Sequence, residues 1–389
     1  MPYFAVFGNH PELSLAEFAS VVPDLKVVLN AESAAIFETS DWDGRRLMRT
    51  LGGTVKLGNI IFRTTAEKFN AEILADEILK QPKEKKILFG FTAYGEAGAA
   101  KKMMFKFPLA LKRALTGRGR SVRWVTGKGG EPLAPAAVSK LKLIAEGYDI
   151  AVFIHGKEIL VGLTTDVQNA DEWSLRDYGR PCRDDKSGML PPKLARMMVN
   201  LAQVPSAGSL LDPFCGSGTV LMEAALASDA FITGSDIDPR QTEASKTNIE
   251  WLVEKNIIDA KAAKRIKILT ADSCGLGRRL PQASIDRIVT EGYMGPPLSG
   301  RETQAQLKKN AAAVKKLWLE SLLALHPLLK PNGRIICIWP SYKTARGTAD
   351  TDLSRDEHIA KLFSVEKKSY IYHRAGQHIY RRIFVLEKI

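Results

Sequence analysis

The stretch that decides the fold occupies residues 210–220 and runs Leu210-Leu211-Asp212-Pro213-Phe214-Cys215-Gly216-Ser217-Gly218-Thr219-Val220. Its apolar start predicts a short strand, and its apolar continuation after Thr219 predicts a helix. Gly216 and Gly218 carry no Cβ, so the backbone of the intervening loop can approach a ligand closely. The stretch therefore predicts a ligand-binding loop between a strand and a helix.

The glycine loop differs from the common nucleotide-binding motifs. Leu221 is the third residue after Gly218, so the G-x-G-x-x-G pattern of dinucleotide sites is absent, and no Gly-Lys-Ser/Thr is present for a P-loop. Asp212, at the end of the strand, would repel a pyrophosphate but suits a cationic ligand. S-adenosylmethionine, with its ammonium and sulfonium groups, is such a ligand, and we expect it as the cofactor.

Two further acidic residues follow later strands. Asp236 ends the strand expected at 231–236 and can accept hydrogen bonds from both hydroxyls of a ribose. Asp272 follows the strand at 266–270 and can accept from the adenine amino group. Each acid alone could instead cap a helix, which Asp commonly does at such junctions. Together the three acids favour a cofactor site, with the expected contacts Asp212, Pro213, Phe214, Gly216, Gly218, Thr219, Asp236, Ile237, Asp272 and Ser273.

The sequence around this loop alternates between short apolar runs and helical segments. Strands are expected at 209–212, 231–236, 266–270, 285–290 and 334–339, and helices at 191–202, 220–227, 241–255 and 304–325. Strands that alternate with helices predict a parallel, doubly wound sheet. The runs 365–372 and 379–386 predict an antiparallel hairpin at the edge of that sheet, around the turn 373–377.

The N-terminal part of the chain predicts two smaller α/β modules. Strands at 3–8, 26–30, 34–38 and 55–64, with helices from residue 11 and at 42–51, give the β-α-β-β-α-β order of a ferredoxin-like domain. We place domain boundaries at 1–65 for this module, 66–168 for a second α/β module, 169–189 for a polar, extended linker around 171–181, and 190–389 for the doubly wound sheet. The second module includes strands at 87–93 and 122–125, a basic helix around 106–115 and a helix at 135–146.

Charge is the unusual part of the composition. The chain of 389 residues has 56 Lys and Arg against 43 Asp and Glu, a net charge of +13, which suggests a polyanionic partner. Residues 101–150 contain eleven Lys or Arg against three Asp or Glu, whereas residues 201–250, with the glycine loop, contain two against seven. The alternative for the basic window is a solvated helix face. The candidates for phosphate contact are Lys101, Lys102, Lys106, Lys112, Arg113, Arg118, Arg120 and Arg123.

The four cysteines and the hydropathy exclude other classes of protein. The cysteines lie far apart, with no C-x-x-C pair and no matching His spacing, so we expect neither a zinc site nor a disulfide framework, and no metal. The N-terminal residues lack the pattern of a signal peptide, and no apolar run approaches the roughly 20 residues of a membrane span. We therefore expect a cytosolic protein that does not bind a membrane.

Several segments resemble a known family. The stretch 212–219 is similar to motif I of class I methyltransferases, in the branch that methylates amino groups of RNA and DNA bases. Taken whole, the chain resembles the THUMP-containing tRNA guanine N2-methyltransferases that act near position ten of tRNA. The other segments that carry the resemblance are Phe7-Gly8-Asn9-His10-Pro11-Glu12-Leu13-Ser14-Leu15-Ala16-Glu17, Arg176-Asp177-Tyr178-Gly179-Arg180-Pro181 and Gly188-Met189-Leu190-Pro191-Pro192-Lys193-Leu194-Ala195. The resemblance implies that residues 66–168 are a THUMP-like RNA-binding module, and that Leu190, Pro191 and Lys193 flank the methionine end of the cofactor.

The end of the fourth strand departs from the pattern of that branch, which is Asp or Asn, two prolines, and Tyr or Phe. This chain has Glu291, Gly292, Tyr293 and Met294 in these places, and Pro296-Pro297 follow. In the branch, the polar side chain and a following carbonyl bind the target amine, and the aromatic ring stacks on a base that has left its helix. The resemblance thus assigns amine orientation to Glu291 and the backbone of 292–294, and stacking to Tyr293. Glu291 could instead cap the next turn.

Three hypotheses follow for the function. We expect an S-adenosylmethionine-dependent RNA methyltransferase that modifies a base of tRNA, on an exocyclic amine such as guanine N2. The second hypothesis is a tRNA-binding protein that retains cofactor affinity but has lost catalysis, because of the altered run at Glu291. The third, a DNA amino-methylase, shares motif I but gives no reason for the N-terminal modules.

Overall fold

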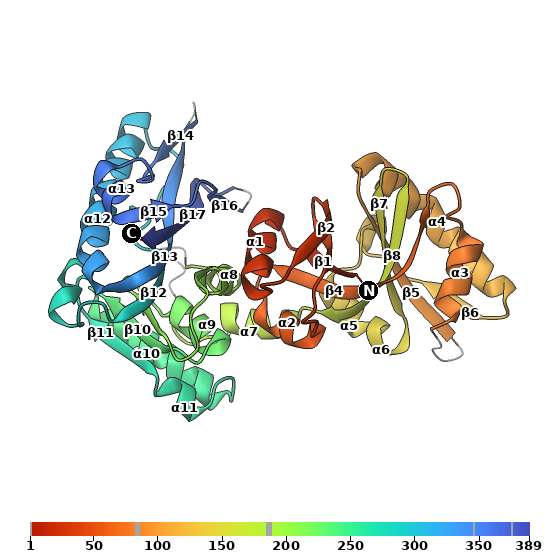
Figure 1. Ribbon diagram of the computed structural model, residues 1–389, viewed down its shortest axis with the longest axis horizontal. Coiled ribbons are helices and arrows are strands. Elements are labelled where there is room, and N and C mark those ends of the chain that lie inside the picture. The colour runs from red at the N-terminus through yellow and green to blue at the C-terminus, as the bar shows by residue number, and fades with distance from the viewer. Residues whose placement is uncertain (1, 82–85, 184–188, 345–346, 375) are drawn as a thin grey trace. The chain divides into compact units, whose positions relative to one another are not determined.

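The computed structural model describes residues 2–81, 86–183, 189–344, 347–374 and 376–389. The chain forms two compact units, Met1–Glu172 and Trp173–Ile389, each with its own sheet (Figure 1). Residues 184–188 of the expected linker and Ala375 of the expected turn lie outside the described residues.

The first unit begins with the expected split β-α-β arrangement. Its elements are β1 (Tyr3–Phe7), α1 (Pro11–Val21), β2 (Lys26–Ala31), β3 (Ala34–Glu38), α2 (Gly44–Thr50) and β4 (Thr54–Thr65). The four strands lie in the order β2-β3-β1-β4, and Phe18 of α1 and Leu47 of α2 are buried against Phe37 of β3. The secondary structure predicted for this segment is confirmed.

The sheet continues without a break into the second predicted module. The further elements are α3 (Ala71–Leu79), β5 (Lys86–Tyr94), α4 (Ala97–Gly117), β6 (Ser121–Trp124), the 3₁₀ helix η1 (Lys128–Gly130), α5 (Pro135–Lys140), α6 (Leu143–Glu146), β7 (Tyr148–His155) and β8 (Glu158–Val167). Antiparallel pairing of β4 with β8 gives one eight-stranded sheet, β2-β3-β1-β4-β8-β7-β5-β6. The single helix predicted at 135–146 is wrong, because Lys142 has φ +52° and separates α5 from α6.

The segment expected to be an extended linker contains a helix. This helix, α7 (Ala170–Tyr178), buries Trp173, and the Arg176 side chain forms a buried ion pair with Glu223 (Nε to Oε1, 2.7 Å). Arg196 also pairs with Glu223, at 2.7 Å. The extended conformation predicted here is therefore wrong for the residues of α7, because Trp173 is buried and Arg176 has a buried partner in Glu223.

The second unit has the expected doubly wound sheet. Its elements are α8 (Pro192–Ala202), β9 (Ser209–Asp212), α9 (Thr219–Ala227), β10 (Phe231–Asp236), α10 (Pro239–Glu254), α11 (Ala260–Ala263), β11 (Ile266–Thr270), η2 (Ser273–Arg278), β12 (Ile285–Thr290), α12 (Gln304–Leu325), η3 (His326–Leu328), β13 (Leu329–Thr344), β14 (Gly347–Asp350), α13 (Glu357–Leu362), β15 (Phe363–Val365), β16 (Tyr370–Tyr372) and β17 (Ile379–Lys388). The strand order is β11-β10-β9-β12-β13-β17-β15, with β11 to β13 parallel.

The edge of this sheet differs in detail from the predicted hairpin. The run 365–372 is divided between β15 and β16, and both pair antiparallel with β17. β17 lies between β13 and β15, and not at the edge. β14, which pairs with an unexpectedly long β13, has no counterpart in the prediction.

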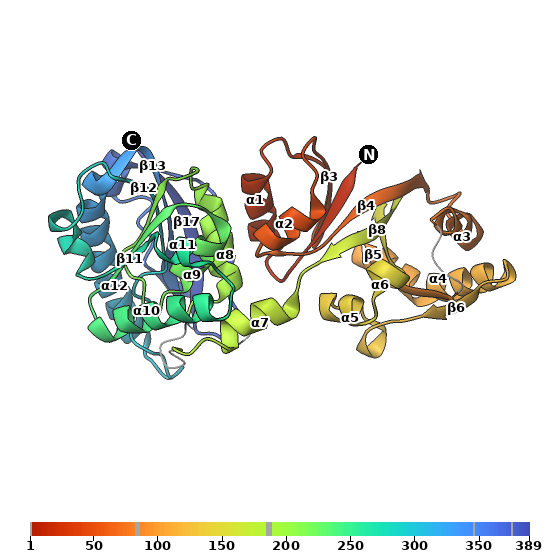
Figure 2. The same cartoon turned by 90° about the horizontal axis from the view of Figure 1, so that it is seen from below.

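The strand order places a crevice at β9 and β12. The chain proceeds outward from β9 through β10 to β11 and then returns to β12 on the other side of β9. In open α/β sheets, ligands bind at the carboxyl ends of the strands where the order reverses in this way. Helices α8 and α12 cover opposite faces of the sheet (Figures 1 and 2), and Trp318 of α12 is buried in the core below the crevice. No helix in the described residues is long and apolar enough to cross a membrane.

Candidate active site

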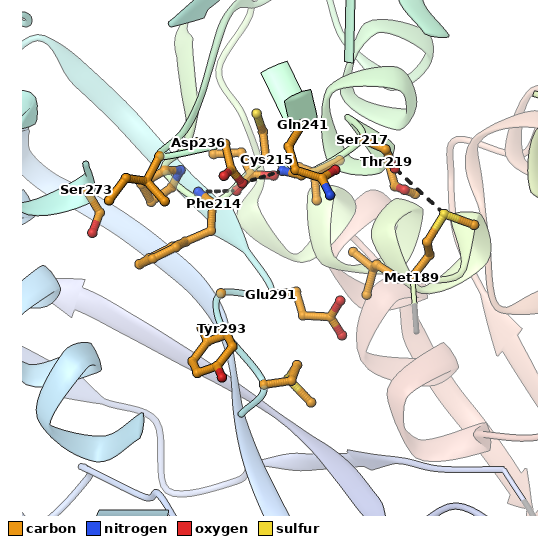
Figure 3. A pocket seen from close by; sticks show the side chains of 18 of the residues that line it. Met189, Phe214, Cys215, Ser217, Thr219, Asp236, Gln241, Ser273, Glu291 and Tyr293 are labelled. Carbon is orange, nitrogen blue, oxygen red and sulfur yellow. Dashed lines mark hydrogen bonds between the residues drawn. The ribbon is translucent and has the colours of Figure 1, made fainter. Parts of the chain in front are cut away.

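The crevice contains a cavity of about 480 Å³, which lies within the range of roughly 300 to 1,000 Å³ that is usual for small-molecule sites. Loops after β9, β10, β11 and β12 form its walls (Figure 3). Its lining residues are Met189, Leu190, Asp212, Pro213, Phe214, Cys215, Gly216, Ser217, Thr219, Val220, Asp236, Ile237, Gln241, Asp272, Ser273, Glu291, Gly292, Tyr293, Met294, Gly295 and Leu317. Figure 3 shows Glu291 and Tyr293 on the opposite side of the cavity from Asp236 and Gln241.

The two glycines of the loop after β9 have different roles. Both have positive φ, +52° for Gly216 and +87° for Gly218. A Cβ at Gly216 would meet no atom nearer than Gln241 Oε1 at 4.0 Å, so this glycine leaves space open beside the cavity. A Cβ at Gly218 would lie 2.8 Å from Ser245 Oγ of α10. Gly218 therefore permits close packing of loop and helix, and it does not line the cavity.

Asp236 and Asp272 differ in whether they cap a helix. The cap of α10 is Asp238, whose side chain accepts from the Arg240 N–H, so Asp236 is not the capping residue. Asp236 Oδ2 accepts from the Gly216 N–H at 3.0 Å, which ties the glycine loop to the end of β10. Asp272 caps η2 by accepting from the Cys274 N–H at 2.9 Å, and it also lines the cavity. The capping alternative thus holds for Asp272 and not for Asp236.

Asp212 is a buried carboxyl group at the base of the cavity. Asp212 is 2% exposed, and its Oδ1 accepts a hydrogen bond from the Phe214 N–H at 3.1 Å. Burial, with a smaller contribution from the negative charges of Asp236 and Glu291, raises the pKa of Asp212 to about 7 against the effect of its hydrogen bonds. A cation in the cavity would lower this pKa, because it stabilises the ionised carboxylate.

Glu291 forms an ion pair that the sequence did not predict. Arg381 of β17 donates from Nε to Glu291 Oε1, and the two side chains are 8% and 15% exposed. Burial raises the pKa of Glu291, and the Arg381 guanidinium opposes that rise. Arg381 therefore favours the ionised form of Glu291, which can accept hydrogen bonds from an amine.

The loop after β12 follows a path that proline could not take. Gly292 has φ +66°, and a Cβ there would lie 2.2 Å from Trp318 Cζ2. Gly295 has φ +89°, and Tyr342 Oη donates to the Met294 carbonyl at 2.8 Å. Because proline is restricted to φ near −65°, the positive φ at position 292 accounts for a glycine in place of the first proline of the usual pattern. Tyr293 of this loop is 49% exposed and lines the cavity.

Most of the residues predicted for the site line this cavity, and three do not. Pro191 lines a neighbouring cavity, Gly218 packs on α10, and the Lys193 Nζ lies 5.8 Å from the centre of the Trp173 ring. The residues that the prediction missed are Met189, Cys215, Ser217, Val220, Gln241, Gly295 and Leu317. Cys215, Ser217 and Val220 belong to the decisive stretch and could have been included, but Gln241 and Leu317 belong to no motif.

The basic residues predicted to bind RNA lie on α4, in the loop after it and on β6. Six are exposed: Lys101, Lys102, Lys106, Lys112, Arg113 and Arg123. Arg118 pairs with Glu72 and Asp76, and Arg120 is half-buried. The exposed aromatic residue Phe105 lies among the α4 residues. The six exposed side chains are therefore the ones positioned to meet a polyanion.

The chain is similar to known methyltransferases in sequence and in fold. Residues 180–365 match the family model of an RMKL-like methyltransferase domain. A probable tRNA (guanine(10)-N2)-dimethyltransferase of Methanothermococcus thermolithotrophicus is 30% identical over 125 residues, which are 32% of this chain and 74% of that protein. This chain belongs to the THUMP-type class I tRNA methyltransferase family. S-adenosylmethionine is the cofactor of class I methyltransferases, and the acidic side chains and the open space at Gly216 fit its cationic groups and its bulk.

A second relative of this tRNA methyltransferase family member and one solved structure are also similar to the chain. The tRNA (guanine(10)-N2)-dimethyltransferase of Methanothermobacter thermautotrophicus is 32% identical over 203 residues, which are 52% of this chain and 50% of that protein. The chain thus spans about half the length of this relative and of the tRNA (guanine(10)-N2)-dimethyltransferase of Pyrococcus abyssi. The crystal structure of TrmN from Thermus thermophilus covers 100% of both chains, with 20% identity and a TM-score of 0.57, and it supports the fold.

Proposed function

We propose that this protein transfers a methyl group from S-adenosylmethionine to an exocyclic amine of a tRNA base, with guanine N2 as the target. The observation that carries the proposal is a single cavity that contains both sets of predicted residues. Asp212, Asp236 and Asp272 line it together with Glu291 and Tyr293, and Figure 3 shows Asp236 on the opposite side from Glu291 and Tyr293. A cytoplasmic location agrees with a tRNA substrate.

On the cofactor side of the cavity, the aspartates and Gly216 would bind S-adenosylmethionine. S-adenosylmethionine, when bound, supplies an electrophilic methyl group on a cationic sulfur. The ionised Asp212 favours a cation in the cavity, and Asp236 and Asp272 are acceptors for hydroxyl and amino groups. Gly216 leaves the space that a bulky ligand requires.

On the substrate side, Glu291 would accept hydrogen bonds from the target amine. The lone pair of an aromatic amine is delocalised into its ring, so an acceptor aligned with its N–H groups makes the nitrogen more nucleophilic. A carboxylate has two oxygens and can accept from two adjacent donors. Guanine presents such donors at N1 and N2, whereas adenine and cytosine present a ring acceptor beside their amine. Tyr293 would stack on the base, and the exposed basic residues of α4 and β6 would contact tRNA phosphates.

The test is methyl transfer from labelled S-adenosylmethionine to an unmodified tRNA transcript, followed by mass spectrometry of the nucleosides. We expect labelled N2-methylguanosine. The Glu291→Gln variant, which keeps the shape of the side chain but lacks its charge, should lower the rate about 100-fold. It should leave the Kd for the cofactor within about twofold.

Two outcomes would contradict this proposal. Binding of both cofactor and tRNA without turnover would favour the alternative, a tRNA-binding protein with an altered methyltransferase domain, which the commitment of Glu291 to Arg381 would then explain. Transfer to duplex DNA in preference to tRNA would assign a different substrate.

A further inference from the structure

A second cavity, of about 360 Å³, lies beside the candidate active site and belongs entirely to the second unit. The two cavities share Met189 and Met294 in their walls. Met294 ends the run that faces the substrate side of the first cavity. A ligand in the second cavity would therefore be adjacent to a base in the first one.

The second cavity is lined mainly by positive and polar groups. Arg183, Arg374 and Arg381 line it, and the imidazole of His378 contributes ring nitrogens that can hydrogen-bond. Asp177 is the one acidic residue among its described lining residues. We propose that this cavity binds a phosphate group of the RNA chain next to the nucleotide that is methylated, an inference that rests on the proposed function.

The chemistry of arginine supports a phosphate as the ligand. A guanidinium group presents several N–H donors in a planar fork that matches the oxygens of a phosphate. The side chains of Arg183 and Arg374 are exposed at the rim, where a large ligand can reach them. The Arg183 guanidinium lies 5.1 Å from the centre of the Tyr178 ring, and Tyr178 is 60% exposed. A cation beside an exposed ring is suited to a nucleotide, which combines an anion with a flat base.

The carboxylate of the cofactor is the other anion that could reach this cavity, because Met189 and Pro191 line it as well. Two observations favour the RNA phosphate. The second cavity adjoins the first at Met294, which belongs to the run assigned to the base. The arginines at its rim are exposed to solvent, as a site for a macromolecule requires.

Arg381 connects the two cavities. It lines the second cavity and donates to Glu291, which lines the first. Because Arg381 is placed in the catalytic machinery, it is unsuitable as a test residue. Arg183 and Arg374 are suitable, since neither makes a described contact with Glu291.

The test compares the double variant Arg183→Gln/Arg374→Gln with Arg355→Gln, which removes an exposed arginine of the same unit that lines neither cavity. The dissociation constant of the full chain for an unmodified tRNA transcript is measured over a range of salt concentrations. We expect the double variant to bind tRNA about tenfold more weakly. Its plot of log K against log salt should have a slope smaller by about 1 to 2, as each phosphate contact contributes about 1. Arg355→Gln should match the wild type within about twofold.

A separate titration with S-adenosylmethionine, without RNA, distinguishes the two anions and shows that the variants are folded. Weaker cofactor binding by the double variant, with tRNA binding unchanged, would overturn the proposal and assign the cavity to the cofactor carboxylate. Unchanged binding of both ligands would overturn it as well. Because binding is measured without turnover, an inactive wild-type protein would contradict the proposed function and leave this measurement valid.

Discussion

In the free protein, burial disfavours the ionised form of Asp212, and a cationic ligand would stabilise that form. Its pKa of about 7 means that the carboxyl group is largely protonated below pH 7 when the cavity contains no cation. A cationic cofactor favours the ionised form, so binding releases a proton below this pH. We expect the affinity for S-adenosylmethionine to fall about tenfold from pH 8 to pH 6, which calorimetry at a series of pH values would measure.

The Asp212→Asn variant is the matched control for this pH dependence. Its affinity should be low and nearly independent of pH. The folded state disfavours the ionised Asp212, so this residue lowers the free energy of unfolding as the pH rises from about 4 through 7. The variant should therefore unfold less readily than the wild type at pH 8, by about 1 to 3 kcal/mol without cofactor. Equal cofactor affinity of the wild type at pH 6 and pH 8 would contradict this interpretation.

The aspartates of the cavity could be predicted from the sequence, whereas the partner of Glu291, Arg381, could not. The three aspartates follow strands at one edge of a parallel sheet, and a periodic sequence is enough to place them there. Arg381 is 90 positions from Glu291, and its strand is one of several apolar runs with basic residues. Only the pairing of β17 with β13 brings it to the cavity.

At the scale of elements, a buried ion pair holds α7 against the rest of the second unit. Glu223 of α9 is 1% exposed in its side chain and pairs with both Arg176 of α7 and Arg196 of α8. Removal of one member of such a group leaves another charge buried without full compensation. We expect Glu223→Ala to lower the free energy of unfolding of this unit by about 3 to 5 kcal/mol, measured by urea denaturation.

An exposed ion pair provides the comparison for that variant. Glu243 of α10 pairs with Lys246 at the surface, with side chains 70% and 50% exposed. Glu243→Ala should change the free energy of unfolding by less than about 1 kcal/mol. A similar small effect for Glu223→Ala would show that the buried cluster does not stabilise the unit.

The positions of helices and strands could be predicted where the hydrophobic pattern of the sequence was strong. The strands and helices of the ferredoxin-like segment, and the strands from β9 to β12, lie close to their predicted positions. The helix α7 was missed because its sequence is polar, and its stability comes from tertiary contacts of Trp173 and Arg176. The division of residues 1–168 into two domains stays a prediction, and both predicted modules contribute strands to one sheet.

For the molecule as a whole, the net charge of +13 combines regions of opposite sign. Residues 201–250 are acidic and surround the cofactor loop, whereas residues 101–150 are basic and include α4. A cationic cofactor and a polyanionic RNA would each be attracted to a different part of the chain. We therefore expect that a fragment of the chain can keep cofactor binding and lose most of the RNA binding.

A fragment of residues 169–389 tests this prediction, because it retains all of α7 and the core of the second unit. We expect it to fold and to bind S-adenosylmethionine within about threefold of the affinity of the full chain. Its affinity for a tRNA transcript should be at least tenfold lower, since it lacks the exposed basic residues of α4 and β6. Filter binding for tRNA and calorimetry for the cofactor would measure the two quantities. Full retention of tRNA affinity by the fragment would refute the assignment of RNA binding to the first unit.

The position of β17 has a consequence for how the protein matures. β17 is the last strand in chain order, but it pairs with β13 inside the sheet and supplies Arg381 to the cavity. During translation, Glu291 is synthesised well before its partner and remains without it until β17 has left the ribosome and inserted between β13 and β15. A nascent chain can therefore acquire the glycine loop and its three aspartates before the substrate side of the cavity is complete. Arg381 therefore completes the wall of the cavity at Glu291 only after the strands that carry the glycine loop and the three aspartates have been synthesised.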